Sequence, residues 1–299
     1  MLHKIFGKLS KEDFIVLNVV ARYLDSYEYV PLRILSDHID LSRKTLNESL
    51  KRLVSLHLLT TDPQNLLGYK MTFTGLNVLS LKRLADRGIV KMLGPMIGVG
   101  KESVVYLAKD HMNRSLAIKF YRIGFKSFKN FSKKRSYDVK SGGNIWLLRS
   151  IFSAEREYEI FNKLNNINAS VPRVFGRELN AIVMEYIEGV LLYKLKVAKD
   201  PYKILRDILE TVRKAYVELG VVHSDLSQYN VLVNISEESE RAYVFDWPQW
   251  VYFYEPSAEN LLIRDLNILI RFFRNRFGIK DISVDKVYKY VTGEAEDFV

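Results

Sequence analysis

The sequence predicts an α+β protein in which an N-terminal winged helix precedes a two-lobed domain. Three observations support this fold class. The first ninety residues carry short helical patterns around two strand-like segments, residues 89–186 carry strand-like segments with a single amphipathic helix, and residues 187–299 are mostly of helical pattern. Strands gathered in one half and helices in the other favour an α+β arrangement of two lobes. We expect the winged helix to cover residues 1–88 and the two-lobed domain residues 89–299.

The first ninety residues have the order helix, helix, helix, hairpin, helix. Apolar residues recur at helical spacing after Ser10, a predicted N-cap. A short helix is predicted at 31–39, and Ser42 begins a third helix with Arg43, Lys44, Lys51 and Arg52 on its outer face. Strand-like segments at 58–62 and 68–74 then lead to a closing helix. This order is typical of winged helices, which bind nucleic acid or dock on proteins. The sequence leaves both uses open.

The two-lobed domain follows a linker predicted at 87–95. Strand patterns flank a glycine turn, and residues 151–166 form an amphipathic pattern that predicts a helix. Two further strands, near 174–187, would end the first lobe. In the second lobe, helices are predicted near 201–219 and 258–278, with short strands at 230–236 and 241–247 between them.

Composition restricts the class of protein. Of 299 residues, 48% are hydrophobic, which is enough for a substantial core. There is no cysteine, which excludes a disulfide scaffold and cysteine-ligated zinc or iron–sulfur sites. The sequence shows neither a signal peptide nor a run of about 18 apolar residues that could span a membrane. We therefore expect a soluble, cytoplasmic protein that does not bind membranes.

Positive charge is concentrated in one part of the chain. The net charge is +10, which fits an anionic partner and equally fits a generic basic surface. The stretch 122–149, however, holds a single acid, Asp138, against eight basic residues: Arg122, Lys126, Lys129, Lys133, Lys134, Arg135, Lys140 and Arg149. We expect a basic loop here that contacts nucleic acid. Its aromatic residues could stack on RNA bases or pack over a ligand.

The segment HSDLSQYNVLV, residues 223–233, carries the clearest chemical signal. Asp225 and Asn230 lie five residues apart in a tight loop that runs into an apolar strand. A second apolar strand carries Asp246 near its end. An acid in such a loop can orient or deprotonate a hydroxyl group, while carboxylate and amide oxygens bind Mg²⁺. We therefore predict a hairpin whose two strands flank a metal site.

Further residues upstream fit the binding of a phosphorylated ligand. Glycines in a turn between strands let backbone amides approach phosphate oxygens, and Lys119 lies on the strand that follows. Glu157, on the amphipathic helix, is the predicted ion-pair partner of Lys119. The residues of the turn are Gly98, Gly100, Lys101, Glu102 and Ser103. Each feature alone is weak, and their order along the chain is the evidence.

Together these motifs resemble the protein-kinase fold, and more narrowly the RIO family of atypical Ser/Thr kinases and ATPases. GVGKESVVY (98–106) is similar to the phosphate loop of this family, HSDLSQYN to its catalytic loop, and VFDWPQWV (244–251) to its metal loop. PSAENLLIRD (256–265) resembles the helix entry that follows. A winged helix in front and an extended basic loop are typical of the second branch of the family. The resemblance covers nearly the whole chain and is closest to a compact, archaeal type.

The resemblance implies a role for each residue that matches a motif. Asp225 would be the catalytic aspartate, and Asn230 and Asp246 would bind Mg²⁺, or Mn²⁺ as an alternative. Lys119, backed by Glu157, would hold the phosphates of ATP beneath the turn. The hinge at Glu185 and Ile187 would bind adenine through backbone groups. The metal-loop acid, Asp246, would become transiently phosphorylated during ATP turnover.

Departures from the family pattern are few. Ser224 replaces a usual glycine, Gln228 a usual glutamate, and Val104 a common aspartate. None removes a metal ligand or the strand lysine, so we expect an active enzyme in which Ser224 restricts the loop backbone. About a dozen residues separate Asp246 from the next helix, too few for an ordinary activation segment. Arg264 and Asp265 are expected to support the catalytic loop.

Four functions remain open at this point. The first is an ATP- and Mg²⁺-dependent Ser/Thr kinase with ATPase activity that acts in small ribosomal subunit maturation, as the resemblance implies. The second is an assembly factor that holds rRNA and ribosomal proteins and uses ATP only as a conformational switch. The third is a winged-helix regulator of DNA. The fourth is a small-molecule kinase of the aminoglycoside type, which shares the catalytic loop but lacks GKES and a winged helix.

Overall fold

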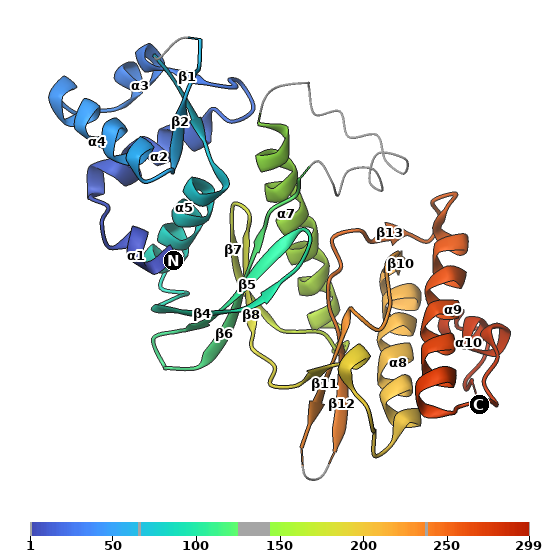
Figure 1. The fold of residues 1–299 in the computed structure, drawn as a ribbon. Helices are drawn as coiled ribbons and strands as arrows, with labels where there is room; N and C mark the ends of the chain where they lie inside the picture. Colours follow the sequence, from blue (N-terminus) through green and yellow to red (C-terminus); the bar gives the residue numbers. More distant parts are fainter. Residues whose placement is uncertain (1, 65–66, 125–143, 237–238, 299) are drawn as a thin grey trace. The chain divides into compact units, whose positions relative to one another are not determined.

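The computed structural model describes residues 2–64, 67–124, 144–236 and 239–298 (Figure 1). They form two compact units. The first contains Met1–Glu155 and Phe175–Val183, and the second contains Arg156–Val174 and Met184–Val299. The expected winged-helix boundary at residue 88 falls inside the first unit and stays a prediction.

The first unit begins with the winged helix expected from the sequence. Its helices are α1 (Leu2–Phe6), α2 (Lys11–Arg22), α3 (Leu32–His38), α4 (Arg43–Ser55) and α5 (Phe73–Asp86), and its strands β1 (Val30–Pro31), β2 (Leu59–Thr61) and β3 (Gly68–Met71) form a sheet in the order β1-β3-β2. Ser10 is the N-cap of α2, as predicted, in a capping box with Asp13. The sequence did not reveal α1 or β1.

Arg52 does not belong to the free outer face of α4, contrary to our expectation. Its Nε donates to Oδ2 of Asp13, on α2, at 2.7 Å. The carboxylate of Asp13 is fully buried and also accepts from the hydroxyl of Ser49 at 2.6 Å. These bonds outweigh burial and hold the pKa of Asp13 below its ordinary value. The ion pair therefore joins the two helices.

A five-stranded sheet completes the first unit. Its strands are β4 (Met92–Val99), β5 (Ser103–Lys109), β6 (Ser115–Tyr121), β7 (Val174–Glu178) and β8 (Ala181–Glu185), in the order β4-β5-β6-β8-β7. Gly94 and Pro95, predicted to be linker, lie within β4, so only residues 87–91 connect it to α5. Proline is tolerated because β4 is an edge strand, and the register with β5 shifts on either side of Met96.

Helix α5 joins the winged helix and this sheet in a single core. Buried residues of both contribute to one hydrophobic cluster, which runs from Leu2 to Val183. A polar network lies within it: Ser80 donates to Oδ1 of Asn180 at 2.9 Å, and Nδ2 of Asn180 donates to Oδ1 of Asn77 at 2.7 Å and to the carbonyl of Tyr121 at 2.8 Å. Buried polar groups of this kind fix one arrangement of the elements around them.

Helix α7 (Ile145–Asn166) starts inside the stretch expected to be a basic loop. Residues 145–149 are therefore helical and not loop. Of the eight basic residues in that stretch, only Arg122 and Arg149 lie in the described residues. Lys126, Lys129, Lys133, Lys134, Arg135 and Lys140 lie outside them.

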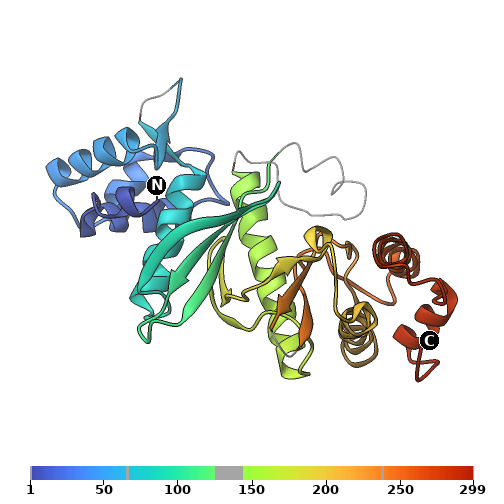
Figure 2. The same ribbon diagram turned by 60° about the horizontal axis from the view of Figure 1, so that its bottom comes forward.

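The second unit is mainly helical, as expected. It holds β9 (Val190–Leu191), the short 3₁₀ helix η1 (Leu192–Lys194), α8 (Pro201–Leu219), β10 (Val221–Val222), β11 (Val231–Ile235), β12 (Glu240–Val244), β13 (Val251–Tyr252), α9 (Ala258–Phe277) and α10 (Val284–Thr292). Two small sheets have the orders β12-β11-β9 and β10-β13. Helices α8, α9 and α10 pack together beside them (Figure 2).

Helix α8 follows from its sequence pattern. Asp200 caps its start by accepting from the backbone N–H of Lys203, and Gly220 ends it with a left-handed φ of 65°. Its buried stripe includes Ile204, Ile208 and Val212, at helical spacing. In the described part of the chain, every helix is too short or too polar to cross a bilayer.

Candidate functional site

The register of the five-stranded sheet places the glycine turn and Lys119 in one region. Gly98 pairs with Val105, and Val105 pairs with Lys119. Residues directly opposite one another in a sheet share a face, so these three positions lie in a row across β4, β5 and β6. The turn at 100–102 is closed by a bond from the N–H of Gly100 to the carbonyl of Ser103 at 2.8 Å. Glu102 also belongs to this turn, and its carbonyl accepts from the N–H of Arg122 at 2.6 Å.

Both glycines have room for a side chain. A Cβ atom added at Gly98 would come no closer than 3.8 Å to Val105, and one at Gly100 no closer than 3.6 Å to Ser103. Both distances are ordinary van der Waals contacts, and neither glycine has the left-handed φ that would demand one. The packing of the chain itself therefore does not require glycine here. Close approach of a ligand to the backbone does explain it.

Lys119 is an unusually buried cation. Its relative exposure is 6%, and its Nζ lies 4.8 Å from the centroid of the Tyr121 ring. Lysine is seldom buried in proteins unless its charge serves a partner. Lys119 lies in a central strand, in the same cross-strand row as Gly98. This position suits an ammonium group that binds phosphate oxygens.

The second unit holds the other predicted residues in two neighbouring loops. Asn230 ends the first loop, and its Nδ2 donates to the carbonyl of Asp225 at 2.8 Å while its N–H donates to the carbonyl of Ser227 at 3.0 Å. Because the amide nitrogen is engaged, Oδ1 is the atom that Asn230 presents to a cation. The loop is thereby folded on itself between β10 and β11.

The second loop carries Asp246 beside Asn230. Strands β11 and β12 are antiparallel, with Val231 opposite Val244, and the N–H of Phe245 donates to the carbonyl of Asn230 at 3.0 Å. The predicted hairpin is confirmed. Asp246 has a φ of 68°, a left-handed conformation that an aspartate adopts at a cost of about 1–2 kcal/mol. The fold holds this strained residue next to the asparagine, as functional residues often are held.

Two buried groups fix the loop of Asp246. His223 is 2% exposed, and its Nε2 lies 3.1 Å from the carbonyl of Phe245, so this nitrogen carries the proton. Oε1 of Glu157, which is fully buried, accepts from the backbone N–H of Trp247 at 2.9 Å. This second contact could not be predicted, because a backbone donor leaves no residue-type signature. The pairing of Glu157 with Lys119, which lies in the other unit, stays a prediction.

Helix α9 supports the loop of Asp225, as expected for Arg264 and Asp265. Oδ2 of Asp265 accepts from the N–H of Leu226 at 3.0 Å, and Arg264 donates to Oδ1 of Asp265 at 2.8 Å and to the carbonyl of Ser224 at 2.6 Å. Asp265 is 1% exposed, and burial raises its pKa to about 6 against the lowering effect of these bonds.

Ser224 is a second left-handed residue, with a φ of 65°. The catalytic-loop motif that this segment resembles usually has glycine here, and glycine would adopt that conformation freely. Here the serine is retained by two contacts, since its hydroxyl donates to the carbonyl of Gln249 and its own carbonyl accepts from Arg264. The expected restriction of the backbone thus takes the form of a loop bound on both sides.

The predicted hinge follows β8. The N–H of Glu185 donates to the carbonyl of Arg173 at 2.7 Å, and the Glu185 carboxylate accepts from the N–H of Arg173 at 3.3 Å. Ile187, two residues on, is half-buried. Among the described residues, no hydrogen bond engages its backbone N–H or carbonyl. Those groups are the ones that an adenine base would use.

The structure thus brings Asp225, Asn230 and Asp246 together through two loops of one unit. It places Lys119 and the glycine turn together in the other. Among the described residues, no three His, Asp or Glu side chains form a metal-binding group. The carboxylate of Asp246 and the amide oxygen of Asn230 are hard donors that suit Mg²⁺, which is usually held by few protein ligands together with phosphate oxygens.

Comparison with known proteins assigns the chain to a family. The model of the RIO domain matches residues 104–287, and the model described as Rio2, N-terminal, matches residues 6–87. A RIO-type serine/threonine-protein kinase Rio2 from Methanocaldococcus jannaschii is 33% identical over 274 residues, which cover 89% of this chain and 98% of the relative. A serine/threonine-protein kinase rio2 from Dictyostelium discoideum is 31% identical over 92% of this chain, which spans only 52% of that relative.

Solved structures show the same fold. The Rio2 kinase of Chaetomium thermophilum in an ADP/Mg²⁺-phosphoaspartate complex superposes with a TM-score of 0.80 at 24% identity, over 97% of this chain and 88% of that one. A second structure of that kinase gives a TM-score of 0.82 at 24% identity, over 96% of this chain and 87% of that one.

Proposed function

The chain belongs to the Rio2 branch of the RIO serine/threonine-protein kinases, and from that premise we propose a specific activity for it. It uses ATP and Mg²⁺ both to phosphorylate serine or threonine and to hydrolyse ATP, as a cytoplasmic factor in small ribosomal subunit maturation. Its partners are rRNA and ribosomal proteins of the immature subunit. The observation that carries the chemistry is the convergence of Asp225, Asn230 and Asp246 described above.

The site residues divide between proton transfer, metal binding and nucleotide binding. Asp225 orients the attacking hydroxyl group and accepts its proton, while Asn230 and Asp246 hold Mg²⁺. Lys119 and the backbone of the turn, with Gly98, Gly100, Lys101, Glu102 and Ser103, bind the phosphates. Glu157 holds the loop of Asp246 through Trp247. Backbone groups at Glu185 and Ile187 bind adenine.

ATP hydrolysis would proceed through Asp246. A carboxylate oxygen of Asp246 attacks the γ-phosphorus, the bond to the β-phosphate oxygen breaks, and ADP leaves. Water then cleaves the acyl phosphate to give inorganic phosphate and restore the carboxylate. The phosphoaspartate of the Chaetomium thermophilum kinase supports this route.

Replacing Asp246 tests the assignment. Asp246→Ala removes a metal ligand and the phosphorylated group together, so turnover of Mg·ATP should fall at least about 100-fold. Glu188→Ala, at an exposed carboxylate beyond the hinge, is the matched control and should hydrolyse ATP normally. Normal hydrolysis by Asp246→Ala would disprove the metal assignment.

An ATP-driven switch without a protein substrate is the alternative, and the short connection between Asp246 and α9 favours it. Residues 247–257 leave little room for a peptide platform. Single-turnover transfer of radiolabelled γ-phosphate, with and without purified small ribosomal subunits, separates the two. Stable label on another protein indicates the kinase, and label released as free phosphate indicates the switch.

Nucleic acid would be bound by the winged helix and by the basic stretch 122–149. Neutralising Lys133, Lys134 and Arg135, which lie outside the described residues, should weaken binding to small-subunit rRNA. The slope of log affinity against log salt should also become shallower by about 0.7–0.9 per lost phosphate contact. A filter-binding titration at several salt concentrations measures both. Unchanged affinity and slope would remove this stretch from the rRNA interface.

A further inference from the structure

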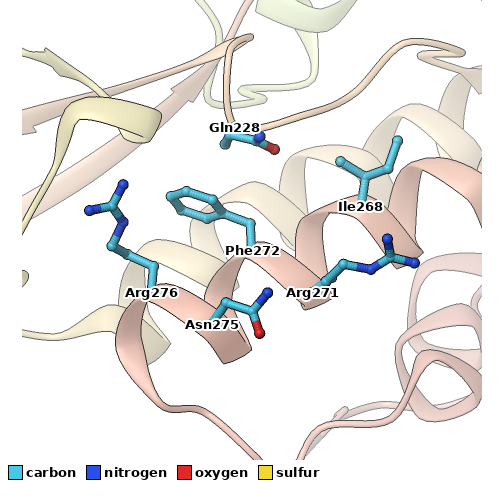
Figure 3. Close-up of a pocket in the computed structure, with 6 residues that line it drawn as sticks. All are labelled: Gln228, Ile268, Arg271, Phe272, Asn275 and Arg276. Atoms are coloured by element: carbon cyan, nitrogen blue, oxygen red, sulfur yellow. The ribbon is translucent and has the colours of Figure 1, made fainter.

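One face of α9 forms a pocket next to the catalytic loop. A cavity of about 400 Å³ is lined by Gln228, Ile268, Arg271, Phe272, Asn275 and Arg276 (Figure 3). The last five recur at intervals of three and four residues, the spacing of a single helix face. Gln228 comes from the loop of Asp225, three residues after that carboxylate. The pocket therefore shares a loop with the predicted catalytic aspartate.

The chemistry of the pocket is cationic. Its lining includes two arginines and no acidic residue among those described. Arg271 is exposed, and within the described part of the chain it forms no hydrogen bond or ion pair. Arg276 donates one hydrogen bond to the carbonyl of Tyr193 at 3.2 Å. A guanidinium group has five N–H donors. Both arginines therefore keep donors for an anionic ligand. Phe272 lies between them and Ile268 lies beside Arg271, so the two apolar side chains form a wall of the pocket (Figure 3).

Gln228 adds a group that can recognise a peptide. Its Oε1 is buried and has no hydrogen-bond partner among the described residues. The terminal torsion of glutamine is soft, so its amide can turn toward a ligand and offer both a donor and an acceptor. The backbone at Gln228 is fixed, because its carbonyl accepts from the N–H of Tyr193 at 3.1 Å.

We propose that this pocket is a specificity site for an acidic side chain, aspartate or glutamate, of the polypeptide whose serine or threonine is phosphorylated. Arg271 and Arg276 lie at opposite ends of the pocket, and either guanidinium group can bind the carboxylate. The apolar wall contacts the methylene groups, and Gln228 pairs with the adjoining peptide group. The inference rests on the proposed catalytic role of Asp225. It supplies, from α9, the recognition that the short segment after Asp246 does not provide.

Binding of two model peptides tests the proposal. One carries a serine flanked by three glutamates on each side, and the other has glutamines in their place. With the full chain, fluorescence anisotropy should give at least about tenfold tighter binding of the glutamate peptide. The double variant Arg271→Gln/Arg276→Gln should lose this preference, with binding of the glutamine peptide unchanged, because charge-assisted bonds to carboxylate are removed.

Arg274→Gln is the matched control. Arg274 lies on the same turn of α9 but donates to the carbonyl of Ile282 at 3.3 Å, away from the pocket. It should keep the tenfold preference. Phosphorylation of the two peptides should follow binding, with a raised KM and unchanged kcat for the glutamate peptide in the double variant.

Three results would overturn the inference. The wild-type chain could bind both peptides equally, the double variant could keep the preference, or the double variant could lose affinity only for a labelled oligouridylate of twelve nucleotides. The last result would mean that the pocket takes RNA phosphates. Peptide-independent ATP turnover is measured in parallel. If turnover fails while the glutamate preference depends on the two arginines, the pocket stands and the catalytic assignment falls.

Discussion

Asp265 is a buried carboxyl group whose charge bears on both stability and the catalytic loop. Its pKa is raised to about 6, chiefly by burial, so between about pH 4 and 6 the folded chain holds a proton there that the unfolded chain releases. The stabilisation linked to this proton is complete below the unfolded pKa and is lost as the pH rises through about 6. Two pKa units correspond to about 3 kcal/mol.

Asp265→Asn should remove this pH dependence while keeping an acceptor for the N–H of Leu226. In urea unfolding at pH 4, 5, 6 and 7, the stability of the wild type relative to the variant should fall by about 2–2.5 kcal/mol from pH 4 to 7. Glu259→Gln, at an exposed carboxylate of the same helix, should give no such difference. Parallel curves for wild type and Asp265→Asn would contradict the shifted pKa.

At this scale, side-chain patterns were predictable from the sequence and backbone contacts were not. Four predictions are confirmed: the assignment to the RIO kinases, the cap at Ser10, the hairpin before Asp246, and the support of the loop by Arg264 and Asp265. The contact of Glu157 with the N–H of Trp247 was not predicted, because any residue at 247 would offer that donor. The left-handed φ of Asp246 and Ser224 was missed for a related reason, since glycine is the residue type that signals it.

Between elements, the ion pair of Asp13 and Arg52 joins α2 to α4. Arg52→Ala would leave the buried carboxylate with fewer donors, so unfolding free energy should drop by about 2–3 kcal/mol at neutral pH. Because the pKa of Asp13 is lowered, this stabilisation is present above the unfolded pKa and is lost as the pH falls.

Urea titration of Arg52→Ala beside Lys51→Ala checks the effect. Lys51 is the exposed neighbour on the same helix, and its replacement should change stability by less than about 0.5 kcal/mol. Equal stabilities of the two variants would show that the ion pair contributes nothing. Arg52→Ala can also be tested for nucleic-acid binding. If its loss of binding equals its loss of folded protein, the role of Arg52 is structural.

Long amphipathic helices were predictable, whereas short strands were not. The spacing of apolar residues predicts α2, α4, α8 and α9 locally. Strands β1, β9, β10 and β13 have two residues each and exist through partners distant in the sequence. Gly94 and Pro95 indicated a linker because an edge position in a sheet cannot be recognised from the local sequence.

For the molecule as a whole, the shared core means that the winged helix and the five-stranded sheet should lose structure together. Asn180→Ala would remove its three side-chain hydrogen bonds, and the buried Oδ1 of Asn77 would lose its donor while the Ser80 hydroxyl still donates to the carbonyl of Leu76, at a cost of about 1–3 kcal/mol. Hydrogen exchange measured by mass spectrometry should then accelerate in α5 and β6 alike.

Asn47→Ala, at an exposed position of α4, is the control and should leave exchange unchanged. Faster exchange in β6 alone would show that the winged helix is stable without the sheet. That outcome would support an independent domain ending at residue 88.

Strand β4 has one more consequence, for solubility. It exposes four large apolar side chains, Met92, Met96, Ile97 and Val99, along the open side of the sheet. Such a strand would ordinarily recruit a neighbouring chain and nucleate aggregates. Pro95 offers no amide hydrogen, and the irregular pairing of β4 with β5 around Met96 disturbs the regular row of backbone groups that an incoming strand would need. Pro95, which the sequence predicted to be part of a linker, thus protects this exposed apolar edge strand from self-association.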